Sequence, residues 1–193
     1  QPYHATATER AAIETKLGEL TRAVESLEKR VKDEDALADV EIARKAAAWT
    51  LRFDEFFEAR DVARTLKLLD KGLARAKELA KGRKPWAQAA GGTVRGYRSR
   101  VDGSVQPYAV IVPAKKGTGK SRLDVVLHGR GANLTEVRFF DSQDGKPAPA
   151  DQEGIVLHIY GRGNNAYRWA GESDVFEAVD AVRRNYSVDD DKI

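Results

Sequence analysis

The sequence predicts an α/β protein in which an antiparallel helical bundle is followed by a sheet built from a hairpin and parallel strands. Three observations carry this prediction. Apolar residues recur at heptad spacing in the N-terminal part, which is typical of packed helices. From Thr93 onward the pattern changes to short apolar runs bounded by turn residues. Those runs then alternate with helical patterns, as in sheets whose parallel strands are joined by helical crossovers.

The heptad spacing is clearest in two segments, which predict the first and third helices. The apolar positions are Ile13, Leu17, Leu20, Val24, Leu27 and Val31 in one, and Val62, Leu66, Leu69, Leu73, Ala76 and Ala80 in the other. An alanine-rich helix with aromatic residues near its end lies between them. Two such seams can pack against each other within one chain, or the first can form a homodimer.

Polar breaks divide these helices and separate them from the rest of the chain. Residues 32–35 form one break, and Asp61 is an expected N-cap of the third helix after a second break. Gly82, followed by Lys84-Pro85, ends that helix. The sequence therefore predicts a helical bundle over 1–82, a linker rich in Ala, Gly and Pro over 83–92, and a second domain over 93–193.

The second domain is expected to open with a hairpin. Asp102-Gly103 separates two strand-like runs, of which the second is Val105–Val112. The following loop, Lys115–Ser121, is similar to the end of a phosphate-binding loop, but Ala114 stands where its first glycine is required. A strand-like run then replaces the required helix, so we reject nucleotide binding.

The remaining elements alternate in type. Leu123–Leu127 and Ile155–Tyr160 are expected strands, and a mostly parallel sheet is expected from them. A short helical segment spans 134–140, with Asn133 or Thr135 near its cap, and an amphipathic helix spans 172–186.

Composition excludes several classes of function. The 33 Lys and Arg are interleaved with 30 Asp and Glu, which leaves no basic stripe for nucleic acid. The absence of cysteine excludes disulfides, zinc–thiolate sites and thiol nucleophiles. None of the three histidines has a partner at metal-ligand spacing, so neither a metal nor another cofactor is expected. No apolar run is long enough to span a membrane.

The N-terminal Gln1-Pro2-Tyr3-His4 carries neither the charged nor the apolar part of a leader sequence. We expect that a signal peptide has been removed from a secreted or periplasmic protein, or that the chain starts downstream of its natural start.

Polar, glycine-containing loops follow both predicted parallel strands. His128-Gly129-Arg130-Gly131 follows the first, and Gly161–Asn165 follows the second. Ligands of open α/β sheets bind beyond the carboxyl ends of the strands. The two loops are therefore expected to lie together at a binding edge.

The order of hairpin, strand, His-Gly-x-Gly, strand and helix resembles the α/β-hydrolase superfamily. With Tyr160–Gly163, Asp174 entering a helix and Asp189–Ile193 following it, residues 93–193 are similar to the prolyl-oligopeptidase-related peptidases and esterases. The resemblance implies the first half of such a sheet, cut before the strand that bears the nucleophile. It implies a serine hydrolase acting on a small-molecule ester or a peptide, with the nucleophile, acid and histidine of the triad beyond Ile193.

The resemblance also assigns roles within the first of the two loops. It makes Gly129, Arg130 and Gly131 the oxyanion loop, with His128 positioning it. The alternative is that both glycines only shape a tight turn. Apart from the resemblance, the residue types of the second loop predict substrate contacts at Arg162, Asn164, Asn165 and Trp169. With Tyr167 and Arg168 they form a cluster of two arginines, two amides and two aromatic residues, which could recognise a carboxylate or a sugar. The alternative for that loop is a surface segment that hydrogen-bonds to itself. His158 is expected to be a packing residue.

The 193 residues contain no Gly-x-Ser-x-Gly motif. We therefore expect them to be a fragment that is inactive alone and that associates with the C-terminal half of the enzyme. The alternative function is a non-catalytic binding or scaffold protein, in which the helices contact a partner and the α/β part is a degenerate hydrolase.

Overall fold

The computed structural model describes residues 3–115, 117 and 119–193. Gln1, Pro2, Lys116 and Thr118 lie outside the described residues, and with them part of the expected loop Lys115–Ser121 and the first two residues of the segment Gln1-Pro2-Tyr3-His4. The α-helices are α1 (Ala7–Glu28), α2 (Glu34–Phe53), α3 (Arg60–Leu79), α4 (Glu136–Gln143) and α5 (Ala170–Asn185). A short 3-10 helix, η1, spans Pro85–Gln88, and the strands are β1 (Gly91–Arg98), β2 (Val105–Val112), β3 (Leu123–Leu127) and β4 (Ile155–Ile159). Within these described residues, no helix is both long enough and apolar enough to cross a membrane.

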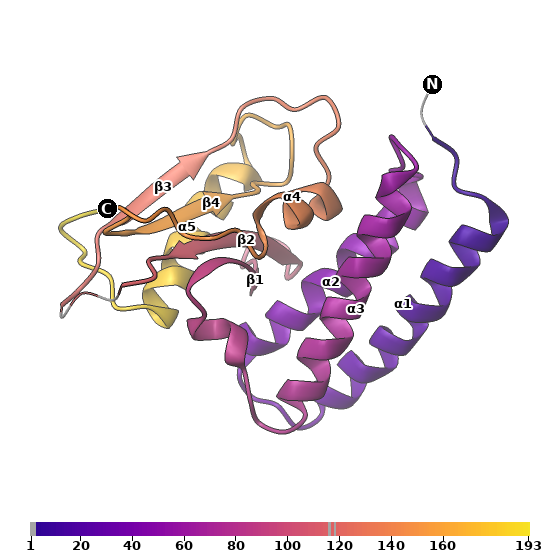
Figure 1. The fold of residues 1–193 in the computed structure, drawn as a ribbon, viewed down its shortest axis with the longest axis horizontal. Coiled ribbons are helices and arrows are strands. Elements are labelled where there is room, and N and C mark those ends of the chain that lie inside the picture. The colour runs from indigo at the N-terminus through magenta and orange to yellow at the C-terminus, as the bar shows by residue number, and fades with distance from the viewer. Residues whose placement is uncertain (1–2, 116, 118) are drawn as a thin grey trace.

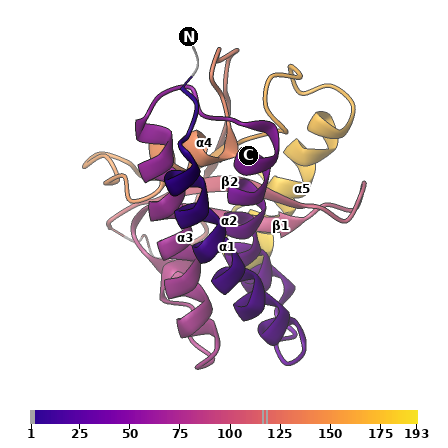
Figure 2. The same ribbon diagram turned by 90° about the vertical axis from the view of Figure 1, so that its right-hand side faces the viewer.

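Helices α1, α2 and α3 form the predicted antiparallel bundle beside the sheet (Figures 1 and 2). The side chain of Thr6 accepts a hydrogen bond from the Glu9 N–H, and the Glu9 carboxylate accepts one from the Thr6 N–H, which fixes the start of α1. The heptad seam of α1 is buried within the chain at Ile13, Leu20, Val24 and Leu27. Packing against α2 and α3 therefore accounts for the seam.

The predicted cap of α3 is wrong. The helix begins at Arg60 after Ala59, which makes no side-chain cap bond. Asp61 lies inside the first turn, and its carboxylate folds back to accept hydrogen bonds from the N–H groups of Phe57, at 2.9 Å, and Glu58, at 3.1 Å. Arg138 of α4 approaches the same carboxylate at 2.7 Å, so Asp61 joins two helices instead of starting one.

The four strands form one mixed sheet in the order β1-β2-β4-β3. Strands β1 and β2 are the predicted hairpin, in which Arg98 pairs with Val105 across the Asp102-Gly103 turn. Strands β3 and β4 are parallel, as predicted for this pair. The broader expectation of a mostly parallel sheet is wrong, because β2 lies between β1 and β4 and is antiparallel to both.

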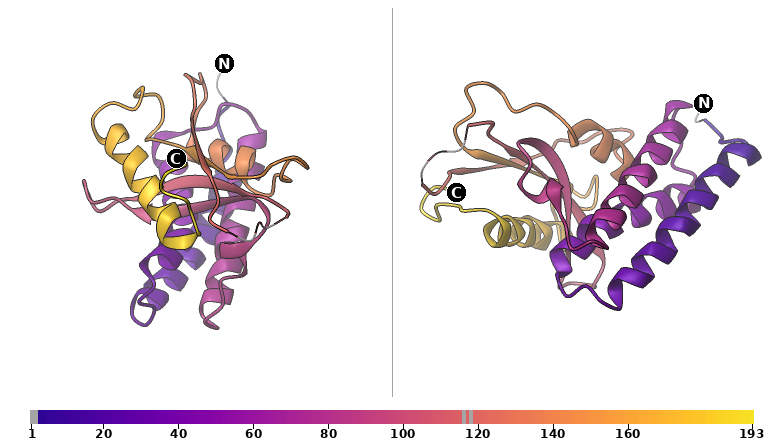
Figure 3. Two further views of the ribbon diagram at one scale, coloured as in Figure 1. Left: turned by 90° about the vertical axis from the view of Figure 1, so that its left-hand side faces the viewer. Right: turned by 60° about the horizontal axis from the view of Figure 1, so that its bottom comes forward.

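Helices lie on both faces of the sheet, the bundle on one side and α5 on the other (Figure 3), and an apolar cluster fills each contact. On one face the core is continuous from the bundle through α4 to residues of β1 and β2, including Val94 and Ala109. On the other face α5 packs against β4 through a cluster that includes Leu157, Ala178 and Val182. The helices do not cover the carboxyl end of β3, where the apolar residues Val126 and Leu127 are exposed.

The segment predicted as a linker is ordered and packed. Pro85–Gln88 forms η1, and Gly91 and Gly92 are the first residues of β1. A side chain at Gly92 would collide with the backbone carbonyl of Gln143, so the strand needs glycine there to lie against the end of α4. The domain boundary stays a prediction, while the packing across it is continuous.

A buried ion pair connects α2 to β1, and we call Asp39, Trp86, Arg95 and Gly96 the joint. Asp39 and Arg95 are both 0% exposed, and their closest atoms are 2.8 Å apart. The carboxylate of Asp39 also accepts hydrogen bonds from the Trp86 indole, at 2.8 Å, and from the Gly96 N–H, at 2.9 Å. Burying two charges costs desolvation energy, and the pair offsets this cost only when its other hydrogen bonds are also made. Around Asp39 these hydrogen bonds are made.

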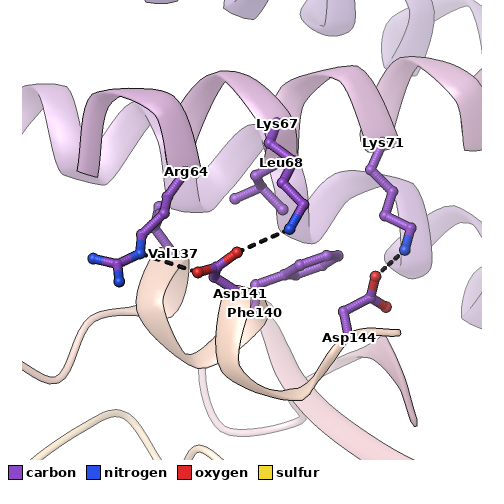
Figure 4. A pocket seen from close by; sticks show the side chains of 8 residues that line it. All are labelled: Arg64, Lys67, Leu68, Lys71, Val137, Phe140, Asp141 and Asp144. Atoms are coloured by element: carbon purple, nitrogen blue, oxygen red, sulfur yellow. Dashed lines mark hydrogen bonds and ion pairs between the residues drawn. The ribbon is translucent and has the colours of Figure 1, made fainter. Parts of the chain in front are cut away.

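Charged side chains also line the contact between α3 and α4 (Figure 4). The Asp141 carboxylate forms ion pairs with Arg64 and Lys67, each at 3.0 Å, and Lys71 pairs with Asp144. Phe140 lies between these pairs and is buried. Helix α4, which follows the loop at residues 128–135, is thus held firmly on the bundle.

Candidate functional site

The two loops expected at the binding edge do lie together. The first follows β3 from His128, the second follows β4 from Tyr160, and the parallel pairing of the strands brings both to one edge of the sheet. They enclose an open cavity of about 750 Å³, which we call the loop cavity. Its lining residues are Leu127, His128, Gly129, Arg130, Ala132, Gly163, Asn164, Asn165, Ala166, Tyr167, Arg168 and Trp169.

The hydroxyl of Tyr167 joins the ends of the two strands. It accepts a hydrogen bond from the His128 N–H, at 2.9 Å, and donates one to the Ile159 carbonyl, at 2.9 Å. Burial raises the pKa of Tyr167 above its ordinary value of 10.0, which keeps the hydroxyl able to donate. A side chain at Gly161 would collide with the Tyr167 ring. Gly161 thus makes the space in which Tyr167 holds β3 to β4.

The imidazole of His128 fixes the first loop from the other side. Its Nε2 lies 2.8 Å from the Tyr160 carbonyl oxygen, and its Nδ1 lies 2.8 Å from that of Gly129. A carbonyl oxygen only accepts hydrogen bonds, so a ring nitrogen that carries a proton donates to the carbonyl beside it. Through these contacts His128 links the first loop to the end of β4, and its role as a positioning residue stays a prediction.

Asn164 and Asn165 hold the loops in place. Asn164 accepts a hydrogen bond from the Gly131 N–H, at 3.0 Å, and donates one to the Gly131 carbonyl, at 2.7 Å. Asn165 accepts from the Tyr167 N–H at 2.8 Å. A side chain at Gly171 would approach Asn165 Nδ2 to 2.5 Å, so this glycine lets α5 start against the amide. Both amides, expected to contact substrate, are engaged by the protein itself.

The hydrogen bonds leave two donors free in the expected oxyanion loop. The N–H groups of His128 and Gly131 are bonded to Tyr167 and Asn164. In the chain as described, residues 3–115, 117 and 119–193, the N–H groups of Gly129 and Arg130 donate to no protein atom. Of the three expected oxyanion residues, these two can therefore bind an external oxygen.

Arg162, another expected substrate residue, does not line the loop cavity. Its Nε lies 2.9 Å from an Asp174 oxygen and its Nη2 lies 3.0 Å from the Ser99 hydroxyl, while Nη1 pairs with Asp102. Hydrogen bonds from Arg162 hold the pKa of Asp102 well below 3.8. Arg162 thereby ties the second loop to the hairpin turn and to α5.

The second loop has a strained backbone. Four of its non-glycine residues have positive φ values: Arg162 (60°), Ala166 (55°), Tyr167 (53°) and Trp169 (53°). Such values are costly for residues with a Cβ atom and persist only where the surroundings enforce them. The contacts of Arg162, Asn165 and Tyr167 supply that enforcement and leave the Trp169 side chain 79% exposed.

His158 lies on β4, away from the loop cavity and facing α4. It lines a smaller cavity of about 410 Å³ together with Val126 and Phe139. Burial, with a contribution from Lys146, lowers the pKa of His158 below 6.5, so the ring is neutral at neutral pH. This placement agrees with a packing role.

The sequence did not reveal the structural role of Tyr167, which was expected only to lie beside the substrate residues of the second loop, whereas its hydroxyl joins the ends of β3 and β4. The available signals were Gly161 and Gly171, whose purpose is to admit the Tyr167 ring and the Asn165 amide. Among the residues that the structure describes, no three His, Cys, Asp or Glu side chains are grouped to hold a metal ion. Comparisons of the chain with protein families, with curated proteins and with solved structures found no match.

Proposed function

We propose that this chain is the N-terminal portion of a serine hydrolase that cleaves an ester or amide, and that its first loop supplies the oxyanion hole. The observation that carries the proposal is the pair of free N–H groups at Gly129 and Arg130, at the carboxyl end of β3 and beside the loop cavity. The loop that bears them is held by Tyr167, His128 and Asn164. Fixed donors of this kind stabilise the negative oxygen that develops in acyl transfer.

The order of the elements supports the proposal. In α/β-hydrolases one oxyanion N–H comes from the loop between the third strand and the following helix, where esterases carry a His-Gly motif. Here the His128–Gly131 segment lies between β3 and α4. The second oxyanion N–H of that fold belongs to the residue after the nucleophile, which the proposal places beyond Ile193.

The last described residues run parallel to the start of β3, which is the direction expected of a strand that leads to the nucleophile. Ser121 and Val188 form a parallel bridge, and the Leu123 N–H donates to the Lys192 carbonyl at 3.0 Å. A strand continuing from Ile193 in this register would lie along β3. At about 3.3 Å per residue, it would come level with His128 about five residues later. A nucleophile at that point would lie beside the loop that bears the free N–H groups.

The test is covalent labelling of the protein made from the reading frame extended past Ile193. We expect a fluorophosphonate to label one serine in a Gly-x-Ser-x-Gly motif within about ten residues of Ile193, located by peptide mass spectrometry. The matched control replaces that serine with alanine and should abolish labelling without changing the unfolding curve. A folded protein that takes no label, or a frame without the motif, would contradict the hydrolase and favour the alternative of a non-catalytic binding or scaffold protein.

A further inference from the structure

The loop cavity has an unusual balance of charge. Two arginines and one histidine line it, at Arg130, Arg168 and His128, and no carboxylate does so among the described residues. The chain as a whole is nearly balanced, with 33 basic and 30 acidic residues. A basic lining concentrated in one cavity raises the local potential for anions.

Both arginines are free to bind a ligand. Arg130 and Arg168 are exposed, and neither makes an ion pair or side-chain hydrogen bond with any residue that the structure describes. Arg162, at the start of the same second loop, shows the opposite arrangement, since Asp102 and Asp174 neutralise it. The acidic residue Glu172 at the start of α5 is exposed and does not line the cavity.

An aromatic surface adjoins the two arginines. Trp169 is 79% exposed, and it is held at φ 53° and ψ −121° at the N-cap of α5. Its carbonyl accepts hydrogen bonds from the N–H groups of Glu172, at 3.1 Å, and Ser173, at 3.4 Å, so the helix start fixes its backbone. An exposed indole on a fixed backbone offers a flat apolar surface for a planar ligand.

We propose that the loop cavity binds a carboxylate carried on an aromatic group, with Arg130 and Arg168 contacting the carboxylate and Trp169 contacting the ring. Guanidinium groups recognise carboxylates through paired, charge-assisted hydrogen bonds. The binding stands on the cavity alone. Its extension to a substrate rests on the proposed function, in which the enzyme selects an ester or amide that also bears a free carboxylate.

The binding can be measured on the 193-residue chain itself. The chain has three tryptophans, so its ¹⁵N–¹H spectrum shows three indole signals, and Trp169→Phe identifies the one from Trp169. We expect phenylacetate to shift the Trp169 signal, and uncharged phenylacetamide and cationic phenethylammonium to leave it in place. Raising the salt concentration should weaken the phenylacetate effect.

Variants connect the binding to the two arginines. The double variant Arg130→Gln/Arg168→Gln should weaken phenylacetate binding by about tenfold or more, because it removes charge-assisted hydrogen bonds. Arg30→Gln, an exposed position in the turn that follows α1, is the matched control and should bind like the wild type. Equal binding of phenylacetate and phenylacetamide, or unchanged binding by the double variant, would overturn the proposal.

The two proposals fail separately. Carboxylate binding without serine labelling of the extended protein would support the anion site and contradict the proposed hydrolase. Serine labelling without carboxylate binding would support the hydrolase and contradict the proposed substrate class.

Discussion

The joint between α2 and β1 and the loop cavity beyond β3 and β4 use arginine in opposite ways. In the joint, Arg95 is 0% exposed and Asp39 meets it with both carboxylate oxygens. In the loop cavity, Arg130 and Arg168 are exposed and have no carboxylate beside them. Paired and buried charges hold the bundle on the sheet, whereas unpaired charges on loops remain available to a ligand. The difference separates the groups that maintain the fold from those that can act on other molecules.

The two regions also differ in backbone. The joint is built on a helix and a strand, and Gly96 lies so close to α2 that a side chain there would collide with Ala38. The second loop instead carries positive φ values at residues with side chains. Regular structure suffices where only packing is required, and strain is found where side chains must be presented at fixed positions.

The largest effect is expected when the joint is broken. Asp39→Ala leaves the Arg95 guanidinium buried without its partner, and it should lower the free energy of unfolding by about 3–5 kcal/mol. Urea unfolding followed by circular dichroism measures the change. Asp70→Ala is the control, because Asp70 pairs with Lys16 at an exposed position, where ion pairs contribute about 0–1 kcal/mol. Equal losses in the two variants would contradict the importance of the joint.

The carboxylate of Asp61 should make the protein sensitive to acid. Burial favours its neutral form, but hydrogen bonds from Arg138, Arg64 and the backbone outweigh burial and hold the pKa of Asp61 below 3.8. A lowered pKa stabilises the fold fully above the ordinary carboxyl pKa, and this stabilisation is lost as the pH falls through the pKa of the folded state.

We expect Asp61→Asn to cost about 1–3 kcal/mol at pH 7. The cost should shrink as the pH falls from about 5 to about 2, since the wild type loses the same interaction. Urea unfolding across this pH range measures both values. A cost that is independent of pH would show that the charge of Asp61 does not matter.

Removing the Tyr167 hydroxyl should loosen the loop cavity with a smaller effect on stability. Tyr167→Phe deletes the bonds to His128 and Ile159, and we expect a loss of about 1–2 kcal/mol. Hydrogen exchange at the His128 amide should become faster. Tyr3→Phe, which deletes a hydroxyl bonded only to Glu9, should leave that exchange rate unchanged. An unaltered rate in Tyr167→Phe would mean that other contacts hold the loop.

The smallest effect is expected at the free arginines. Arg130→Gln and Arg168→Gln should each change the free energy of unfolding by less than about 0.5 kcal/mol, because neither side chain has a partner to lose. The same urea titration measures them. A loss of 2 kcal/mol or more, roughly the loss of a structural ion pair, would place these residues with the joint.

The sequence could predict the elements that local patterns encode. Heptad spacing located α1 and α3, and Asp102-Gly103 located the hairpin, because each signal lies within a few residues. The joint could not be predicted, since a single aspartate in an alanine-rich helix does not reveal a partner 56 residues away. Asp61 was misassigned for a related reason, because its partner Arg138 lies 77 residues away.

The candidate site was predictable in place and only partly in detail. The carboxyl ends of parallel strands directed attention to His128–Gly131 and Gly161–Asn165, and both lie at the loop cavity or next to it. Which loop residues hold the loops together and which are free to bind a ligand depends on hydrogen bonds between the two loops. Only the structure could show that Asn164 is bonded to Gly131 while Arg168 is free.

The central claim is that the first loop binds the negative oxygen of an acyl-transfer reaction. The most direct test is a crystal structure of the extended protein after reaction with a fluorophosphonate. The account predicts a phosphonyl oxygen about 2.7–3.1 Å from the backbone nitrogen of Gly129 or Arg130, with the Tyr167 and Asn164 hydrogen bonds intact. A phosphonyl oxygen bound by other groups, away from this loop, would contradict the account.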